Sequence, residues 1–300
     1  IQFVFPLIAF VLGNEFAKKG KNSYKIFEYI FWIYLSIISF QLIEAVIFRD
    51  FVLKSNLYKL GIYNHLQYIS VFIAITFLTC INYFLEKNKI NFLQAAILSL
   101  LTNIYVIFST SISGLLYTLF LTILLFYLNK RKIFVYSLIL FLTIIFFLKF
   151  QFDFQKDFID TVIFKIINFI PLFIERISST LFYINEISNL REFFFGKNND
   201  FETNPLFDTS FNYYIDFIYN FGIITFLPLL YLILSFIKKF SYNFNYVSNH
   251  IIFLGFMILI FILFDTFIKS SLREIFTGNL LFFLWGYTYY FLKSKKNDKV

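Results

Sequence analysis

The segment QFDFQKDFIDTVIFKIINFIPLFIERISSTLFYINEISNLREFFFGKNNDFETNPLFD, residues 151–208, carries a dense mixture of basic and acidic side chains. Long apolar runs stand before and after it, and each has the character of a lipid-spanning helix. We therefore expect one large outward-facing loop, fixed over a membrane by a scaffold of helices. We also expect the chemistry to lie in this loop and in the helix that follows it, to about residue 224.

The composition is that of a membrane protein. Hydrophobic residues make up 59% of the chain and charged residues 15%, whereas a soluble domain has about 25% charged residues. A chain this apolar cannot cover itself in water. The single cysteine, Cys80, excludes an intrachain disulfide and predicts a buried, inert thiol. No Cys or His cluster indicates a metal site, so we expect neither a metal nor a cofactor.

Several apolar runs approach the ~20 residues that a helix needs to cross a bilayer. The first run begins at Ile1 without an initiator Met, which predicts a truncated span and helices missing upstream. The expected fold is all-α, a polytopic membrane helix bundle of about nine spans in a single membrane domain, 1–300, with a partly helical loop over 151–208. The predicted spans are 1–13, 26–48, 67–85, 91–109, 112–128, 133–150, 209–236, 250–268 and 275–292.

Basic side chains gather in alternate loops. By the positive-inside rule these loops are cytoplasmic, so the loop over 151–208 faces out. The net charge of +8 is then a signal of topology, and no nucleic-acid partner is expected. The basic residues of these loops are Lys18, Lys19, Lys21, Lys25, Lys87, Lys89, Lys130, Arg131, Lys132, Lys238, Lys239, Lys293, Lys295, Lys296 and Lys299, accompanied only by the acids Glu15, Glu86 and Asp298.

Within the outer loop, Pro171 divides two helical halves and Gly196 closes the second. Residues 172–191 form a pattern typical of an amphipathic helix that lies along the membrane surface. Two guanidinium groups on one stripe suit an anionic group such as a diphosphate. A solvated face, with Arg176 paired to Glu175 or to Thr180, is the alternative. The polar stripe consists of Arg176, Thr180, Tyr183 and Arg191.

Polar residues also stand inside the spans, always towards their outer ends. Ionisable groups in a bilayer are costly and by default line a cavity or form pairs. A simple helix-end pair of Asp265 with Lys269 is the alternative for those two residues. The residues concerned are Gln41, Glu44, Asp216, Asp265, Lys269 and Arg273.

The histidines and the serine run are weaker candidates. His250 begins a span on the cytoplasmic side, and His65 has no partner nearby in the sequence. Ser111 and Ser113 stand in no nucleophile motif, and their run predicts a helix cap at a short outer turn.

The layout resembles the O-antigen polymerase / O-antigen ligase family over nearly all of the chain. The features that carry the likeness are the many spans, the Ser-Ile-Ser-Gly turn at 111–114, and one large outer loop. Arg176 stands about 20 residues before FFFG (193–196), and DTSFNYYIDFIYNFGIITF (208–226) follows.

This resemblance implies a membrane glycosyltransferase of the GT-C type, in a multi-pass protein of the bacterial cytoplasmic membrane. It would act at the outer face on sugars linked to undecaprenyl diphosphate. Arg176 would be the loop arginine, Gly196 the turn after the loop helix, and Asn212 and Gly222 part of the post-loop motif. Two positions depart from the family: Ile112, where Arg is frequent, and Phe211, where ligases have His. The absent His favours a polymerase over a ligase.

The predicted reaction is transfer of a lipid-linked oligosaccharide to the hydroxyl of an acceptor repeat unit. Cations would stabilise the departing diphosphate: Arg176 and Arg191 first, then Arg273 and Lys269. A carboxylate would be the base, with Asp208, Glu44 and Asp216 as candidates in that order. The expected partners are the lipid-linked oligosaccharide, membrane lipid and a chain-length regulator protein. The alternatives are an O-antigen ligase and a flippase or other transporter of the same lipid-linked units.

Overall fold

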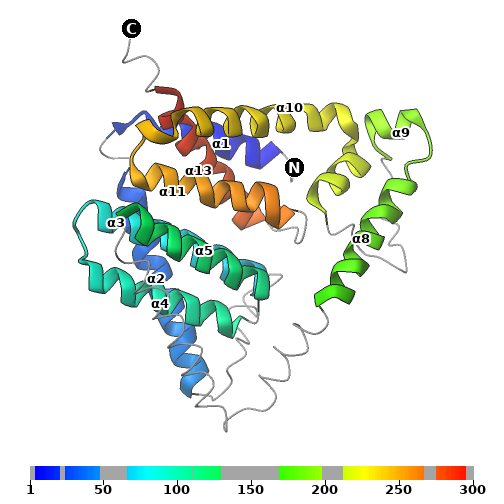
Figure 1. The fold of residues 1–300 in the computed structure, drawn as a ribbon. Helices are drawn as coiled ribbons and strands as arrows, with labels where there is room; N and C mark the ends of the chain where they lie inside the picture. Colours follow the sequence, from blue (N-terminus) through cyan, green and yellow to red (C-terminus); the bar gives the residue numbers. More distant parts are fainter. Residues whose placement is uncertain are drawn as a thin grey trace. The chain divides into compact units, whose positions relative to one another are not determined.

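The computed structural model describes residues 4–20, 24–47, 66–109, 111–129, 169–197, 212–266 and 275–294. Every regular element in these ranges is helical, which confirms the all-α prediction for them (Figure 1). The elements are α1 (Val4–Ala17), α2 (Lys25–Ile47), α3 (Leu66–Glu86), α4 (Phe92–Phe108), α5 (Ile112–Asn129), α8 (Phe169–Asn185), α9 (Leu190–Phe195), α10 (Tyr213–Asn243), η5 (Phe244–Tyr246), α11 (Asn249–Leu259), η6 (Ile260–Asp265) and α13 (Ile275–Ser294).

Among the described residues, three helices are long and apolar enough to cross a membrane: Lys25–Glu44, Ile69–Glu86 and Tyr213–Tyr246. Shorter apolar helices cover Phe5–Ala17, Phe92–Ile107, Ser113–Asn129 and Asn249–Asp265. All the predicted spans except one contain a helix, and the exception, 133–150, lies outside the described residues. The total of about nine spans stays a prediction.

The chain divides into two compact units. One consists of Ile1–Asn14, Asn168–Tyr246 and Ile258–Val300, and the other of Glu15–Ile167 and Val247–Met257. We call them the α10 unit and the α3 unit, each after one of its long helices. A single membrane domain over 1–300 stays a prediction.

In the α3 unit, α3 is the central helix. Residues 69–84 are buried without interruption, and α3 packs against α2, α4 and α5. Polar side chains join the helices where lipid offers no partner, as is usual between membrane helices. The bonds run from Tyr105 Oη to Gln41 Oε1 (2.6 Å), from Asn103 Nδ2 to Thr122 Oγ1 (3.1 Å) and from Asn129 Nδ2 to Asn82 Oδ1 (2.8 Å).

In the α10 unit, α1 and α13 meet backbone to backbone. A Cβ atom on Gly13 would lie 1.9 Å from the carbonyl oxygen of Phe283, and one on Gly286 would lie 1.9 Å from that of Phe10. The Phe10 ring also packs edge-on against Trp285, with 5.7 Å between ring centroids. Small residues allow such close approach between apolar helices and thereby increase their packing contact.

The longest helix, α10, is broken near its start. Gly222 has φ 76° and ψ 166°, so the helical path stops there and resumes in a new direction. Figure 1 shows the short first part of α10, in yellow-green, set at an angle to the long remainder. The break turns the part of α10 that carries Asp216 away from the axis of the long helix.

We predict that Gly286→Ala weakens the α1–α13 contact, because its new methyl group meets the Phe10 backbone, which cannot rotate aside. The expected loss of stability is about 1–3 kcal/mol, the usual cost of overpacking. Thermal unfolding of the detergent-solubilised protein measures it.

Gly114→Ala is the matched control. Its Cβ would meet a side chain, Val71 Cγ2, at 2.2 Å, and a side chain yields more readily than backbone. A larger loss in Gly114→Ala than in Gly286→Ala would contradict the account.

Candidate functional site

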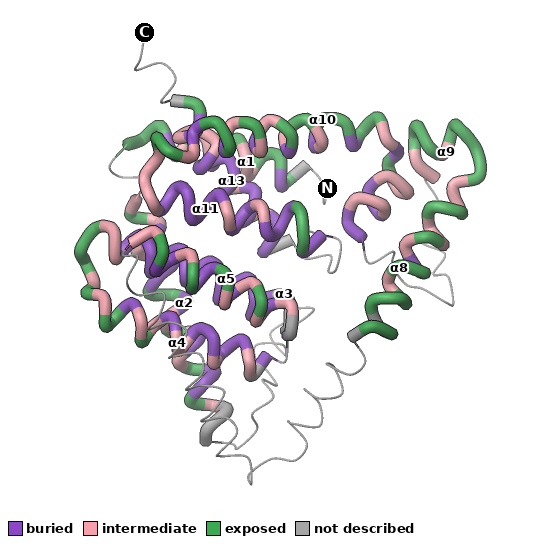
Figure 2. The backbone as a smooth tube through the Cα atoms, viewed as in Figure 1, coloured by how far each residue is buried: buried purple, intermediate pink, exposed green. Residues whose placement is uncertain are grey.

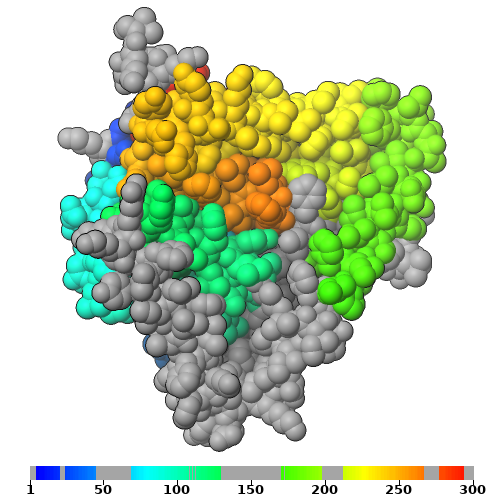
Figure 3. All heavy atoms as spheres, in the orientation of Figure 1, coloured from blue at the N-terminus to red at the C-terminus, as the bar shows by residue number. Residues whose placement is uncertain are grey.

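The candidate site is the region where α8 and α9 pack against the first part of α10, all within the α10 unit. Figure 3 shows the green atoms of α8 and α9 continuous with the yellow-green atoms of α10. The contact face of α8 includes the fully buried Ser179 and Tyr183, whose ring meets Tyr219 edge-on with centroids 5.0 Å apart. Arg176 stands three residues before Ser179 and seven before Tyr183, and therefore shares this face. It is half-buried.

The opposite face of α8 is apolar and exposed (Figure 2). Its residues recur at helical spacing, which confirms the predicted amphipathic character for α8. An exposed apolar stripe beside a membrane-crossing helix suits contact with lipid. The stripe consists of Ile170, Phe173, Ile174, Ile177, Leu181 and Ile184.

The single helix predicted over 172–191 is wrong. The helix α8 ends at Asn185, and α9 begins at Leu190 after a cap by Asn189, whose side chain accepts a hydrogen bond from Glu192 N at 2.9 Å. Arg191 therefore lies exposed on α9 and not on the stripe of Arg176. The signal for this break was present in the sequence: an Asn followed three residues later by a Glu is a helix start.

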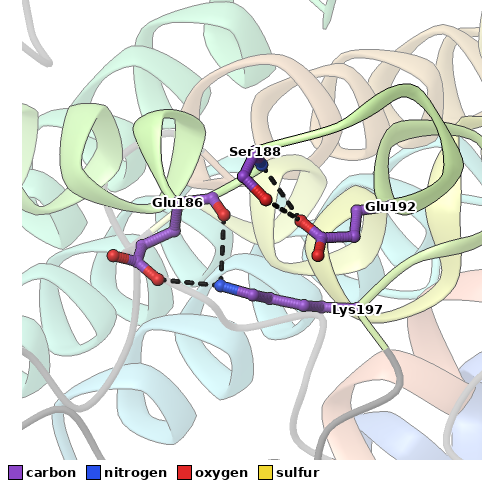
Figure 4. Close-up of polar contacts among 4 residues, drawn as sticks. All are labelled: Glu186, Ser188, Glu192 and Lys197. Atoms are coloured by element: carbon purple, nitrogen blue, oxygen red, sulfur yellow. Dashed lines mark hydrogen bonds and ion pairs between the residues drawn. The ribbon is translucent and has the colours of Figure 1, made fainter.

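Two carboxylates and an ammonium close the turn between α8 and α9 (Figure 4). Lys197 Nζ donates to Glu186 Oε2 at 2.8 Å and to the Glu186 carbonyl at 3.1 Å. The Glu192 carboxylate accepts from both the backbone N–H and the hydroxyl of Ser188, each at 3.0 Å. No functional role is predicted for these residues from the sequence. Part of the mixed charge of the predicted outer loop therefore stabilises the turn between α8 and α9.

The hydrogen bonds of this turn shift two pKa values. The backbone N–H of Ser188 is the main cause that lowers the pKa of Glu192. The hydrogen bond to Glu186 is the main cause that raises the pKa of Lys197. The Lys197 ammonium also lies 5.5 Å from the centre of the Tyr219 ring, which links the turn to α10.

Two glycines join α9 to the break in α10. A Cβ on Gly196 would lie 2.4 Å from the carbonyl oxygen of Asn220, and one on Gly222 would lie 2.2 Å from that of Phe194. Both glycines have positive φ, 82° and 76°, a region that other residues rarely adopt. Gly196 is predicted as the turn after the loop helix and Gly222 as part of the post-loop motif. In the structure, each glycine lies against the backbone of residues next to the other glycine.

The contact also pairs the backbone groups that the break frees. Lys197 N donates to the Tyr219 carbonyl at 2.8 Å. The Thr225 hydroxyl lies within hydrogen-bond distance of the carbonyls of Phe221 (2.6 Å) and Gly222 (2.9 Å). A broken helix in an apolar setting needs such partners, since lipid supplies none.

The first part of α10 carries buried polar residues. Asn212 caps the helix, and its side chain accepts from Tyr214 N at 3.0 Å and Ile215 N at 3.3 Å. Asp216, one turn later, is 7% exposed. The Asn220 amide donates to the Asp216 carbonyl at 2.7 Å.

A hydrogen bond joins this part of α10 to the π-helix η6. Tyr214 Oη donates to the Ile262 carbonyl at 2.6 Å, and η6 ends at Asp265, which is 1% exposed. Single π-turns are frequent at functional sites. Asp216 and Asp265 thus stand on two segments that this bond draws together.

Other candidates stand elsewhere. Glu44 is half-buried on α2 in the α3 unit, and its catalytic role stays a prediction. Gln41, on the same helix, is bonded to Tyr105. His65, Asp208, Lys269 and Arg273 lie outside the described residues.

Two of the remaining polar candidates, Ser111 and His250, lie at the N-terminal ends of helices. The Ser111 hydroxyl accepts from Gly114 N at 3.3 Å, as the predicted cap requires. His250 stands at the start of α11, and its backbone N–H donates to Glu86 Oε2 at 2.7 Å. Cys80 is buried as predicted.

Within the part of the chain that the structure describes, no group of three or more His, Cys, Asp or Glu side chains could hold a metal ion. No protein-family model, curated protein or solved structure matches this chain.

We predict that Gly222→Ala separates α9 from α10. The methyl group would meet the Phe194 backbone, and the positive φ at position 222 would strain any residue other than glycine. We therefore expect the variant either not to fold or to lose several kcal/mol of folding free energy. Limited proteolysis between α8 and α10 in membranes measures the separation. Gly20→Ala is the control: Gly20 also has positive φ, but a Cβ there meets nothing within 4 Å. Equal protease sensitivity of both variants would contradict the role of the contact.

We predict that acid loosens α9. A carboxyl whose pKa is lowered by folding stabilises the fold above its unfolded pKa, and this stabilisation is lost as pH falls through the folded value. Hydrogen–deuterium exchange over 186–197, corrected for intrinsic rates, should therefore rise below the ordinary glutamate pKa of about 4.3. In Glu192→Gln the exchange should already be raised at neutral pH and change little with acid. Acid sensitivity equal to that of the parent chain would refute the assignment to Glu192.

Proposed function

We propose that this chain is a membrane glycosyltransferase that polymerises oligosaccharide repeat units linked to undecaprenyl diphosphate into a surface polysaccharide. The observation that carries the proposal is the packing of α8 on the first part of α10. This packing sets the face that carries Arg176 against the short segment in which Asp216 is buried. A cation for a departing diphosphate and a carboxylate for an acceptor hydroxyl then belong to one region.

The reaction needs few groups. The acceptor hydroxyl attacks the anomeric carbon of the donor sugar, and the bond from that carbon to the phosphate oxygen breaks. The lipid diphosphate leaves with the electron pair, and the hydroxyl proton passes to a carboxylate base. Stabilising the diphosphate charge is the larger task, and general-base help adds to it. Neither step requires a cofactor.

Arg176 is the best candidate for the diphosphate. Its guanidinium can bind phosphate oxygens in a bidentate fork, and its place on the contact face of α8 holds it towards α10. Arg191, exposed on α9, is a second cation that could meet substrate from solution. Lys269 and Arg273 follow Asp265 in the sequence and would complete the cationic set.

For the base, Asp216 is favoured by position, since it is buried on the segment that α8 covers. Asp208 precedes the Asn212 cap by four residues, and Glu44 comes from the α3 unit. A buried carboxyl is held in a less polar setting, which makes it a stronger base when it is ionised.

Location follows from the apolar helices and from the charge of the loops. The protein would be a multi-pass protein of the bacterial cytoplasmic membrane, with the α8–α9 region at the outer face. Its substrate partner would be the lipid-linked oligosaccharide, and a chain-length regulator would be a protein partner. The likeness to the O-antigen polymerase / O-antigen ligase family supports these assignments.

We predict that Arg176→Ala abolishes polymer while the protein stays in the membrane. Loss of one preorganised charge contact to a transition state typically costs about 10²–10³ in rate. Complementation of a deletion strain, followed by gel analysis of the surface glycan and immunoblotting of membranes, measures both. Arg176→Lys should restore part of the polymer, and Lys18→Ala, an exposed lysine that pairs with Glu15, should restore all of it.

The deletion strain itself separates the alternatives. Glycan with a single repeat unit indicates a lost polymerase, and polymer stalled on the lipid indicates a lost ligase. Absence of surface glycan, with inward-facing lipid-linked units, indicates a lost flippase. Polymer of normal length from Arg176→Ala would refute the role of the arginine, and normal polymer in the deletion strain would refute the proposed function.

A further inference from the structure

A second cluster of charged side chains lies at the far end of α10, beyond the proposed reaction. The Tyr289 hydroxyl of α13 is its centre. Lys239 Nζ donates to this hydroxyl at 2.5 Å, and Ser235 Oγ, one turn earlier on α10, lies 2.9 Å from it. The Lys239 ammonium also lies over the Tyr289 ring, 3.8 Å from its centre. We call Ser235, Lys239, Tyr289 and Lys293 the basic cluster.

Packing fixes this geometry. The Phe10 ring lies edge-on to the Tyr289 ring at 5.6 Å, and the Asn243 amide donates to the Leu292 carbonyl at 3.1 Å. The last turns of α10 and α13 are therefore held side by side. Lys293, exposed in the last turn of α13, stands four residues after Tyr289 and therefore on the same side of the helix.

The positive charge of this cluster has no carboxylate to balance it among the residues that the structure describes. Elsewhere in these ranges, Lys18, Lys89 and Lys197 each form an ion pair with a glutamate. Lys239 instead meets hydroxyl groups. An ammonium has three donors, so Lys239 keeps donors available after its bond to Tyr289.

The neighbouring face of α10 shows at what depth the cluster lies. Exposed residues follow one stripe, with Tyr231 and Leu234 before Lys238 and Tyr242 after it. Tyrosines gather at the level of lipid headgroups, and long lysine side chains extend to the same level. Lys239, next to Lys238, therefore stands where phosphate groups of the bilayer are concentrated.

We propose that the basic cluster is a binding site for the phosphate of an anionic phospholipid headgroup. Lys239 and Lys293 would supply the charge, and the Tyr289 hydroxyl, which accepts from Lys239 and can accept from Ser235, would donate one hydrogen bond to a phosphate oxygen. A phospholipid would bind here in preference to a soluble anion, because its acyl chains would cover the exposed apolar stripe of α10 beside the headgroup. The assignment is independent of the proposed sugar transfer.

Native mass spectrometry of the full chain in detergent tests this site, with dioleoyl phosphatidylglycerol and dioleoyl phosphatidylcholine as probes. Phosphatidylglycerol should bind more tightly, because phosphatidylcholine carries a compensating cation. Lys239→Ala and Lys293→Ala should each lower the affinity for phosphatidylglycerol about fivefold, the usual effect of one lysine near an anionic surface. Tyr289→Phe should lower it about two- to threefold through loss of one hydrogen bond.

Lys18→Ala is the matched control and should leave both affinities unchanged. If Lys239→Ala does not give a folded protein, Tyr289→Phe, which removes only the hydroxyl, carries the test. Equal affinity for the two lipids, or an unchanged preference in Tyr289→Phe and Lys293→Ala, would overturn the proposal. Displacement of the lipid by millimolar inorganic phosphate would also overturn it, since the cluster would then bind the free anion.

Discussion

A helix that breaks in an apolar environment must find partners for the backbone groups it frees, and the α10 unit depends on how α10 meets this demand. Lipid offers no hydrogen bonds, so the Tyr219 carbonyl takes its bond from Lys197 N. Lys197, two residues after the end of α9, can supply this bond only because Gly196 and Gly222 let the two backbones touch. The loop that carries most of the mixed charge is thereby attached to a spanning helix through its main chain.

The break at Gly222 also sets the direction of the first part of α10. Because α10 turns at Gly222, its first part, which carries Asn212 and Asp216, leaves the axis of the long helix. The helix α8 packs against this part through Tyr183 and Tyr219. The Asn212 cap satisfies two N–H groups of this short part, so it can persist as a helix although it is brief. A buried carboxyl and the arginine face of α8 are then held on a frame of glycine contacts and capped ends. A reaction that relies on positioned charges needs this kind of rigidity.

The residues differ in how far the sequence predicts them. Apolar runs of sufficient length predict helices well, since lipid leaves the backbone little choice. Only the family resemblance singles out Asn212 and Gly222, and it does not predict that one caps α10 and the other breaks it. The division of α8 from α9 is missed, because helical periodicity continues past Asn185 while the cap at Asn189 interrupts it. Gln41 is expected to line a cavity or to form a pair, and its partner, Tyr105, comes from another helix that no local pattern identifies. Pairs such as Lys197 with Glu186, or Tyr289 with Lys239, depend on tertiary contacts that no local pattern encodes.

The two ends of α10 differ in whether their lysine side chains form ion pairs. Near its start, the Lys197 ammonium is balanced by the Glu186 carboxylate. At its end, Lys239 donates to the Tyr289 hydroxyl of α13, and no carboxylate among the described residues forms an ion pair with it. A lysine whose only role is to set membrane topology does not need a hydrogen bond to a tyrosine whose ring is fixed by Phe10. The ordered hydroxyls around Lys239 are better explained by a partner that accepts hydrogen bonds and carries negative charge, and at that depth of a bilayer the abundant group with both properties is a phosphate.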